Sequence, residues 1–119
     1  MESILKTIRK LIGPEEDYTY FDPQLIIHIN SAFSRLCQLN VGPTIPFRIT
    51  SADETWSDFM PNEMMPDNVK DFIYLYVKKI FDPPQNSFLM TAINEEIEKL
   101  EWLLNSEAEV GYARGGSQS

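Results

Sequence analysis

The side chains best suited to catalysis are a single histidine and a single cysteine, and both lie in apolar segments. His28 stands between Ile27 and Ile29, whereas a catalytic base needs a nucleophile or a substrate within hydrogen-bond reach. Cys37 has no histidine or basic residue next to it in the sequence to lower the pKa of its thiol. We therefore interpret both as packed or rim residues and predict that the protein is not an enzyme, with a small hydrolase as the alternative.

Glutamates crowd the segment from Glu95 to Glu101, and carboxylates can bind hard cations. A run of glutamates without a ligating histidine is usually a solvated helix face. The sequence also lacks a glycine-rich phosphate loop and paired cysteines, and one cysteine cannot form an intrachain disulfide. We expect no metal and no cofactor.

The charge balance limits the possible partners. The 119 residues include 10 Lys and Arg against 18 Asp and Glu, a net charge of -8. Such a chain is poorly suited to hold nucleic acid by neutralising phosphates. It is compatible with a protein that surrounds DNA without gripping it.

Apolar residues recur at helical spacing in four segments, which predicts an all-α fold. The segments are 4–12, 22–40, 68–81 and 87–105, and we expect the second to be the central core helix. Gly13-Pro14 and Pro83-Pro84 supply breaks between them. Asp22, Asp67 or Asn68, and Ser87 are the expected N-caps of the last three helices. The predicted architecture is a compact bundle of about four helices.

Two segments fall outside this helical pattern. Residues 44–66 contain several prolines and predict a long loop, in which Phe47–Thr50 resembles a short strand and Thr55–Phe59 forms one helical turn that packs Trp56 and Phe59 onto the core. Residues 106–119 predict a flexible acidic and Gly/Ser-rich tail that orders on a partner, so the expected domain is 1–105. Neither a signal peptide nor a membrane span is expected.

Several short segments occur in an order that resembles one protein family. They are Glu16–Tyr18, Ile26–Ser31, Leu39–Pro43, Thr55–Phe59, Val69–Leu75, Phe81–Pro84 and Glu98–Asn105. Together they resemble the head–tail connector proteins of tailed bacteriophages, also described as DNA-packaging or adaptor proteins. The resemblance covers roughly residues 4–105, and its most specific part is Phe81–Pro84.

The resemblance implies a structural protein in the neck of the virion, assembled in the host cytoplasm. Its helical subunits would form a ring under the portal, in register with the twelve-fold symmetry of the portal, and extend the channel through which DNA passes. A stopper or tail-completion protein would bind below. DNA would pass through the channel without sequence-specific binding.

Aromatic residues are more numerous than a core of this size should need, and aromatic residues are favoured at interface centres. We expect subunit or portal contacts from a set of ten residues, although burial in the core is the alternative for each. The set is Tyr18, Tyr20, Phe21, Trp56, Phe59, Tyr74, Phe88, Trp102, Tyr112 and Arg114.

The acidic residues have a separate expected role. Glu95, Glu98 and Glu101 are candidates for an acidic lumen that repels DNA phosphates and lets the duplex slide, with plain solubility as the alternative. Two other functions remain open. One is a tail-completion or stopper protein of the neck, and the other is an acidic helical binding protein that mimics DNA.

Overall fold

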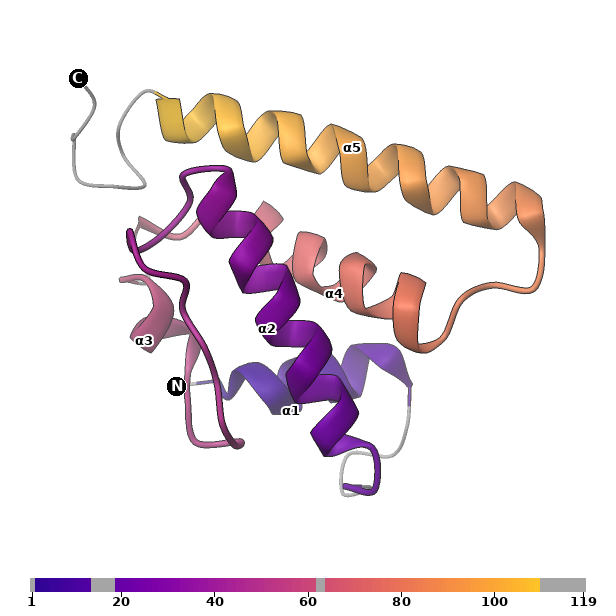
Figure 1. Ribbon diagram of the computed structural model, residues 1–119, viewed down its shortest axis with the longest axis horizontal. Helices are drawn as coiled ribbons and strands as arrows, with labels where there is room; N and C mark the ends of the chain where they lie inside the picture. The colour runs from indigo at the N-terminus through magenta and orange to yellow at the C-terminus, as the bar shows by residue number, and fades with distance from the viewer. Residues whose placement is uncertain (1, 14–18, 62–63, 110–119) are drawn as a thin grey trace.

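The protein is helical in the computed structural model, which describes residues 2–13, 19–61 and 64–109 (Figure 1). Its helices are α1 (Ile4–Ile12), α2 (Asp22–Gln38), α3 (Trp56–Phe59), α4 (Asn68–Phe81) and α5 (Ser87–Glu109). The described residues contain no strand beyond an isolated bridge between Ser3 and Thr55. The all-α prediction is confirmed, and α3 is the helical turn expected in the long loop.

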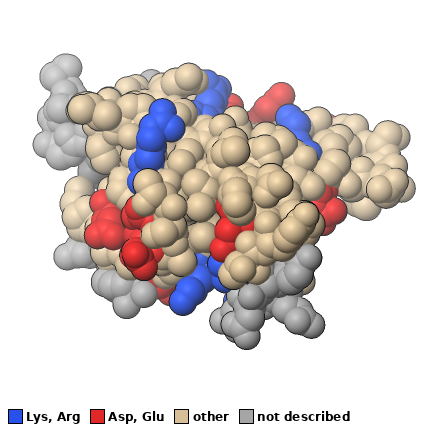
Figure 2. All heavy atoms as spheres, turned by 60° about the horizontal axis from the view of Figure 1, so that its bottom comes forward, with Lys and Arg blue, Asp and Glu red and all other residues tan. Residues whose placement is uncertain are grey.

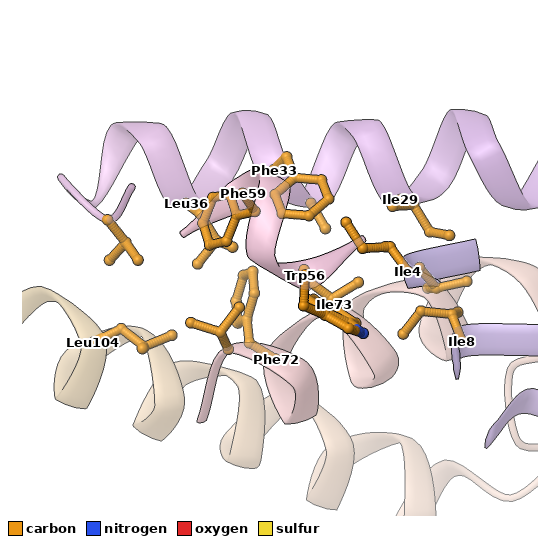
Figure 3. Close-up of a cluster of buried hydrophobic side chains, with 14 of the residues drawn as sticks. Ile4, Ile8, Ile29, Phe33, Leu36, Trp56, Phe59, Phe72, Ile73 and Leu104 are labelled. Atoms are coloured by element: carbon orange, nitrogen blue, oxygen red, sulfur yellow. The ribbon is translucent and has the colours of Figure 1, made fainter. Parts of the chain in front are cut away.

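The core is built around α4, which packs against α1, α2 and α5. Phe72 and Ile73 of α4 are fully buried. Figure 3 shows Phe72 between α2 side chains and Leu104 of α5, and Ile73 beside Trp56. The sequence pointed to α2 as the central helix because of its wide apolar stripe. That stripe covers one side of the core, whereas α4 has neighbours on several sides.

The start of α2 departs from the predicted capping. Asp22 is the first residue of the helix rather than its N-cap, and Phe21 precedes it without a side-chain cap. The Asp22 carboxylate instead accepts two hydrogen bonds from Arg9, at 3.1 Å from Nε and 2.7 Å from Nη2. Arg9 is only 3% exposed. A buried guanidinium needs a paired acceptor, and this pair ties α1 to the beginning of α2.

Two expectations for α5 need correction. Asn86, not Ser87, caps the helix, because its Oδ1 accepts from the amides of Phe88 (2.7 Å) and Leu89 (3.2 Å). The helix also continues past Asn105 to Glu109, and Ala108 is buried. The predicted boundary at 105/106 is therefore too early, since Ala108 continues the apolar stripe four residues beyond Leu104.

The long loop between α2 and α4 is folded onto the helices without forming the expected strand at Phe47–Thr50. The Asn30 side chain of α2 holds this segment like a neighbouring strand. Its Oδ1 accepts from the Ile49 amide at 2.8 Å, and its Nδ2 donates to the Ile49 carbonyl at 3.0 Å. These bonds satisfy the backbone groups of a buried residue, so no ladder is required.

Gly42 provides a sharp test of how tightly this loop packs. It has φ +88, and a Cβ there would lie 2.6 Å from the buried ring of Phe59. Gly13 also has positive φ, +121, but a Cβ there would meet nothing within 4 Å. Gly42→Ala should therefore cost about 2–4 kcal/mol of unfolding free energy, and Gly13→Ala only about 1–2 kcal/mol. Urea denaturation measures both, and equal losses would show that the Phe59 ring yields freely.

Candidate assembly surface

Three of the ten predicted contact residues present large exposed aromatic surfaces. Tyr20 is 72% exposed, Phe88 is 77% exposed and Trp102 is 68% exposed. Tyr20 precedes α2, Phe88 lies in the first turn of α5, and Trp102 lies further along the same helix. Aromatic side chains are favoured at the centres of protein interfaces, so these three rings are candidates for contacts with a partner.

The remaining members of the predicted set divide into three groups. Phe21 and Tyr74 are half-buried, and the Phe21 ring packs edge-on against Phe81 at 5.2 Å. Trp56 and Phe59 are 4% exposed. The three residues Tyr18, Tyr112 and Arg114 lie outside the described part of the chain.

Trp56 and Phe59 are core residues, which corrects their assignment as contact residues. The Trp56 indole donates a hydrogen bond to Thr7 Oγ1 at 3.1 Å, and the Phe59 ring packs on Phe33 at 4.8 Å. The predicted packing of the Thr55–Phe59 turn onto the core is confirmed. Both side chains are buried in the core and leave almost no surface for a partner.

The three lumen candidates differ in their surroundings. Glu95 and Glu98 are exposed on α5. Glu101 instead accepts two hydrogen bonds from Arg35 of α2, at 2.9 and 3.0 Å. These hydrogen bonds raise the pKa of the Arg35 guanidinium. Glu101 is thus neutralised by a cation that fastens α5 to α2, and it offers little net charge to a lumen.

His28 and Cys37 cannot act together as a catalytic pair. Both lie on α2 and are half-buried. Their separation along one helix is about 13 Å, given a rise of about 1.5 Å per residue. Within the described ranges, no three His, Cys, Asp or Glu side chains gather as a metal site.

The sequence did not predict an apolar groove between α4 and α5. It has a volume of about 450 Å³ and is lined by Leu75, Lys78, Pro84, Leu89, Ala92, Ile93 and Glu96. Because α5 has 23 residues and α4 only 14, part of α5 must extend beyond α4. In the sequence, the unequal lengths of the periodic segments 68–81 and 87–105 were the signal that could have indicated this groove.

A carboxylate anchors the turn that precedes α3. Glu54 accepts hydrogen bonds from the amides of Thr50 (2.9 Å) and Ser51 (3.1 Å) and from the Thr50 hydroxyl (2.9 Å). The Glu54 carbonyl also accepts from the Ile4 amide at 3.0 Å. This turn therefore joins the long loop to the start of α1.

The Glu54 anchor predicts an acid-sensitive contribution to stability. Partial burial raises the pKa of Glu54, but the hydrogen bonds from Thr50 and Ser51 outweigh it, and the net pKa is lowered. Because the folded-state pKa is lowered, the anchor contributes stability at pH values above the unfolded-state pKa of about 4.3. This contribution is lost as the pH falls through the folded-state pKa. In urea titrations, Glu54→Gln should flatten this acid decline. Glu98→Gln controls for loss of one negative charge, and an unchanged decline in Glu54→Gln would contradict the anchor.

The described residues form a small helical fold with three large exposed aromatic side chains. Over residues 4–111 the chain matches the family described as phage connector protein. The match spans most of the chain, and the chain belongs to the phage connector protein family. Comparison with curated proteins and with solved structures gave no match.

Family membership confirms the resemblance found in the sequence and assigns a role. The family consists of structural proteins, and the chain is a bacteriophage connector that takes part in virion assembly. None of the helices in the described ranges is both long enough and apolar enough to cross a bilayer.

Proposed function

We propose that copies of this chain form a ring below the portal that joins the phage head to the tail and extends the DNA channel. The observation that carries the proposal is the exposure of Tyr20, Phe88 and Trp102 on a chain that belongs to a connector family. Tyr20 lies before α2, and Phe88 and Trp102 lie on α5, so exposed rings are available on two elements of the fold. The ring would match the twelve-fold portal and receive a stopper or tail-completion protein below.

The channel would be formed by surfaces that do not hold the phosphates. A net charge of -8 for each copy gives a ring a strongly negative field. Glu95 and Glu98 are the exposed carboxylates on α5 that we assign to the lumen. DNA would then slide through without sequence-specific contacts. Assembly would take place in the host cytoplasm, and the mature location would be the neck of the virion.

The face shown in Figure 2 does not carry the charge array of a DNA mimic. A mimic needs carboxylates arrayed along one face at phosphate-like density. On the face shown in Figure 2, acidic groups are interrupted by basic groups and by wide uncharged areas. A stopper protein of the same neck remains the nearest alternative function.

Attachment to the portal tests the proposal. We assign docking to the loop 44–66 and to the C-terminal tail, whose start now follows Glu109 rather than Asn105 because Ala108 belongs to the core. The full chain, mixed with the portal protein of the same phage, should appear as an added ring in negative-stain images. A chain ending at Glu109 should keep its helical circular dichroism and lose this ring.

Two outcomes would count against these assignments. If the shortened chain attaches as well as the full chain, the tail does not dock. If the full chain adds no ring to the portal at all, the position below the portal is wrong.

A further inference from the structure

The apolar stripe of α5 loses its cover toward the start of the helix. Leu104 is 1% exposed and Ile97 is 8% exposed, whereas Leu89, on the same stripe, is 51% exposed. Leu89 and Ile93 form one wall of the groove, with Leu75 of α4 opposite and Pro84 at the end. The groove is therefore a continuation of the core that this chain does not fill.

A rigid apolar projection lies elsewhere on the molecule, at residues Pro43–Pro46. Its tip is Ile45, which is 76% exposed and stands directly before Pro46. Prolines restrict the backbone on both sides of the tip, so its conformation is largely set before binding. We refer to this segment as the Ile45 projection.

Buried residues fix the base of the Ile45 projection on both sides. Val41, which precedes it, is 2% exposed. Phe47, which follows it, packs edge-on against Phe33 of α2 at 5.1 Å. Cys37 Sγ also donates to the Thr44 carbonyl at 3.4 Å. The projection is thus held out from the surface by the core, and it needs no further ordering to bind.

The projection and the groove lie at opposite ends of the molecule. In Figure 1 the segment that leaves α2 forms the left side, and the first turn of α5 forms the right end, along the longest axis. A contact between these two different surfaces would be heterologous, which generates rings or filaments rather than closed pairs. Such a contact suits a subunit that must meet a neighbour on each side.

The charges around the two surfaces are also complementary. Arg48 is the sole charged residue in the sequence from Asn40 to Ile49, and it is exposed without a described ion-pair partner. Glu96 lies on the rim of the groove and is likewise exposed. Lys78 also lines the groove, but its ammonium group is paired with Asp82 at 3.4 Å. An apolar tip followed by one cation therefore matches an apolar groove in which Glu96 is the lining charge without a described ion-pair partner.

We infer that the Ile45 projection of one copy inserts into the α4–α5 groove of the next copy, with Arg48 facing Glu96. The inference rests on the proposed ring and names the contact that builds it. Ile45 covers Leu89 and Ile93 and so completes the apolar stripe of the neighbouring α5. The same contact, repeated from copy to copy, uses only the start of the loop 44–66 and leaves the rest of that loop, with Tyr20, Phe88 and Trp102, available for the portal and other components of the neck.

Site-specific cross-linking of the full chain tests this contact. In a Cys37→Ser background, Thr44→Cys and Ala92→Cys place one thiol beside the tip of the projection and one in the groove, and Ile45 itself is kept. Both sites are exposed, so the fold should persist. With a short bis-maleimide, the chain that carries both cysteines should give a ladder of covalent oligomers. A chain with Thr44→Cys and Glu98→Cys, of which Glu98 lies outside the groove, should give only background dimers.

Charge reversal provides an independent measurement. Arg48→Glu and Glu96→Arg should each weaken self-association of the chain by about tenfold, measured by analytical ultracentrifugation. Combining the two in one chain should restore association to near the original level. Restoration requires that the two residues face each other, and its absence overturns the pairing.

A lysine-reactive cross-linker separates failure of this inference from failure of the ring. If lysine cross-linking gives oligomers while the projection–groove pair does not, copies associate through another surface and the inference is overturned. If neither reagent gives oligomers, even with the portal present, the proposed ring itself is wrong.

Discussion

Replacing Arg9 with alanine should lower the free energy of unfolding by about 3 kcal/mol, near the lower end for breaking a buried ion pair. The Arg9 side chain is 4% exposed and that of Asp22 is 19% exposed, with 2.7 Å between Nη2 and Oδ2. Removal of the guanidinium leaves the Asp22 carboxylate poorly solvated against the end of α1. Water can reach part of Asp22, and for this reason we expect the lower end of the range.

Urea denaturation followed by circular dichroism measures this loss. Arg9→Met keeps most of the apolar stem and separates packing from charge, so it should lose less than Arg9→Ala. The double change Arg9→Met with Asp22→Leu removes both charges and should recover part of the stability. A loss below about 1 kcal/mol in Arg9→Ala would mean that the pair behaves as a surface salt bridge.

The helices were predictable because their breaks are local. Gly13 and the Pro83-Pro84 pair end α1 and α4 close to where the sequence analysis placed the ends. Glycine and proline act through the backbone of their own residues, so no distant partner has to be known. The all-α class follows from helical periodicity between such breaks.

The N-caps were not predictable in the same way. Asp22 has the chemistry of a cap, but Arg9 lies close in the fold and claims both carboxylate oxygens. Asn86 and Ser87 are adjacent residues that can both cap, and only the backbone path decides that Asn86 does. Whether a side chain caps its helix or binds a tertiary partner depends on contacts with other segments, so the sequence of one segment cannot decide it.

The contact surface was predictable only in part. Composition indicated an excess of aromatic residues, yet it could not distinguish the buried Trp56 from the exposed Trp102. Trp56 sits in a short turn that folds over α1, whereas Trp102 lies on the side of α5 away from its buried stripe. The position of Trp102 relative to Leu100 and Leu104 could have been read from helical periodicity.

Replacing Phe33 with alanine should cost about 3–5 kcal/mol, a large share of the stability of a domain this size. Phe33 is 1% exposed, and its ring meets those of Phe47 and Phe59 at 5.1 and 4.8 Å. The deletion removes apolar burial, opens a cavity and ends two aromatic contacts at once. Phe33→Leu keeps most of the volume and should cost less.

The Phe33 change should also act on assembly, because Phe47 anchors one side of the Ile45 projection. Phe33→Ala should weaken self-association even without urea, under conditions in which the chain is still folded. Trp102→Ala is the matched control for stability, because loss of an exposed ring should change the free energy of unfolding by no more than about 0.5 kcal/mol. If Phe33→Ala loses stability but associates as tightly as the original chain, then the projection does not depend on the aromatic cluster beneath it. If it loses less than about 1 kcal/mol, the cluster is not the tightly packed core that its distances indicate.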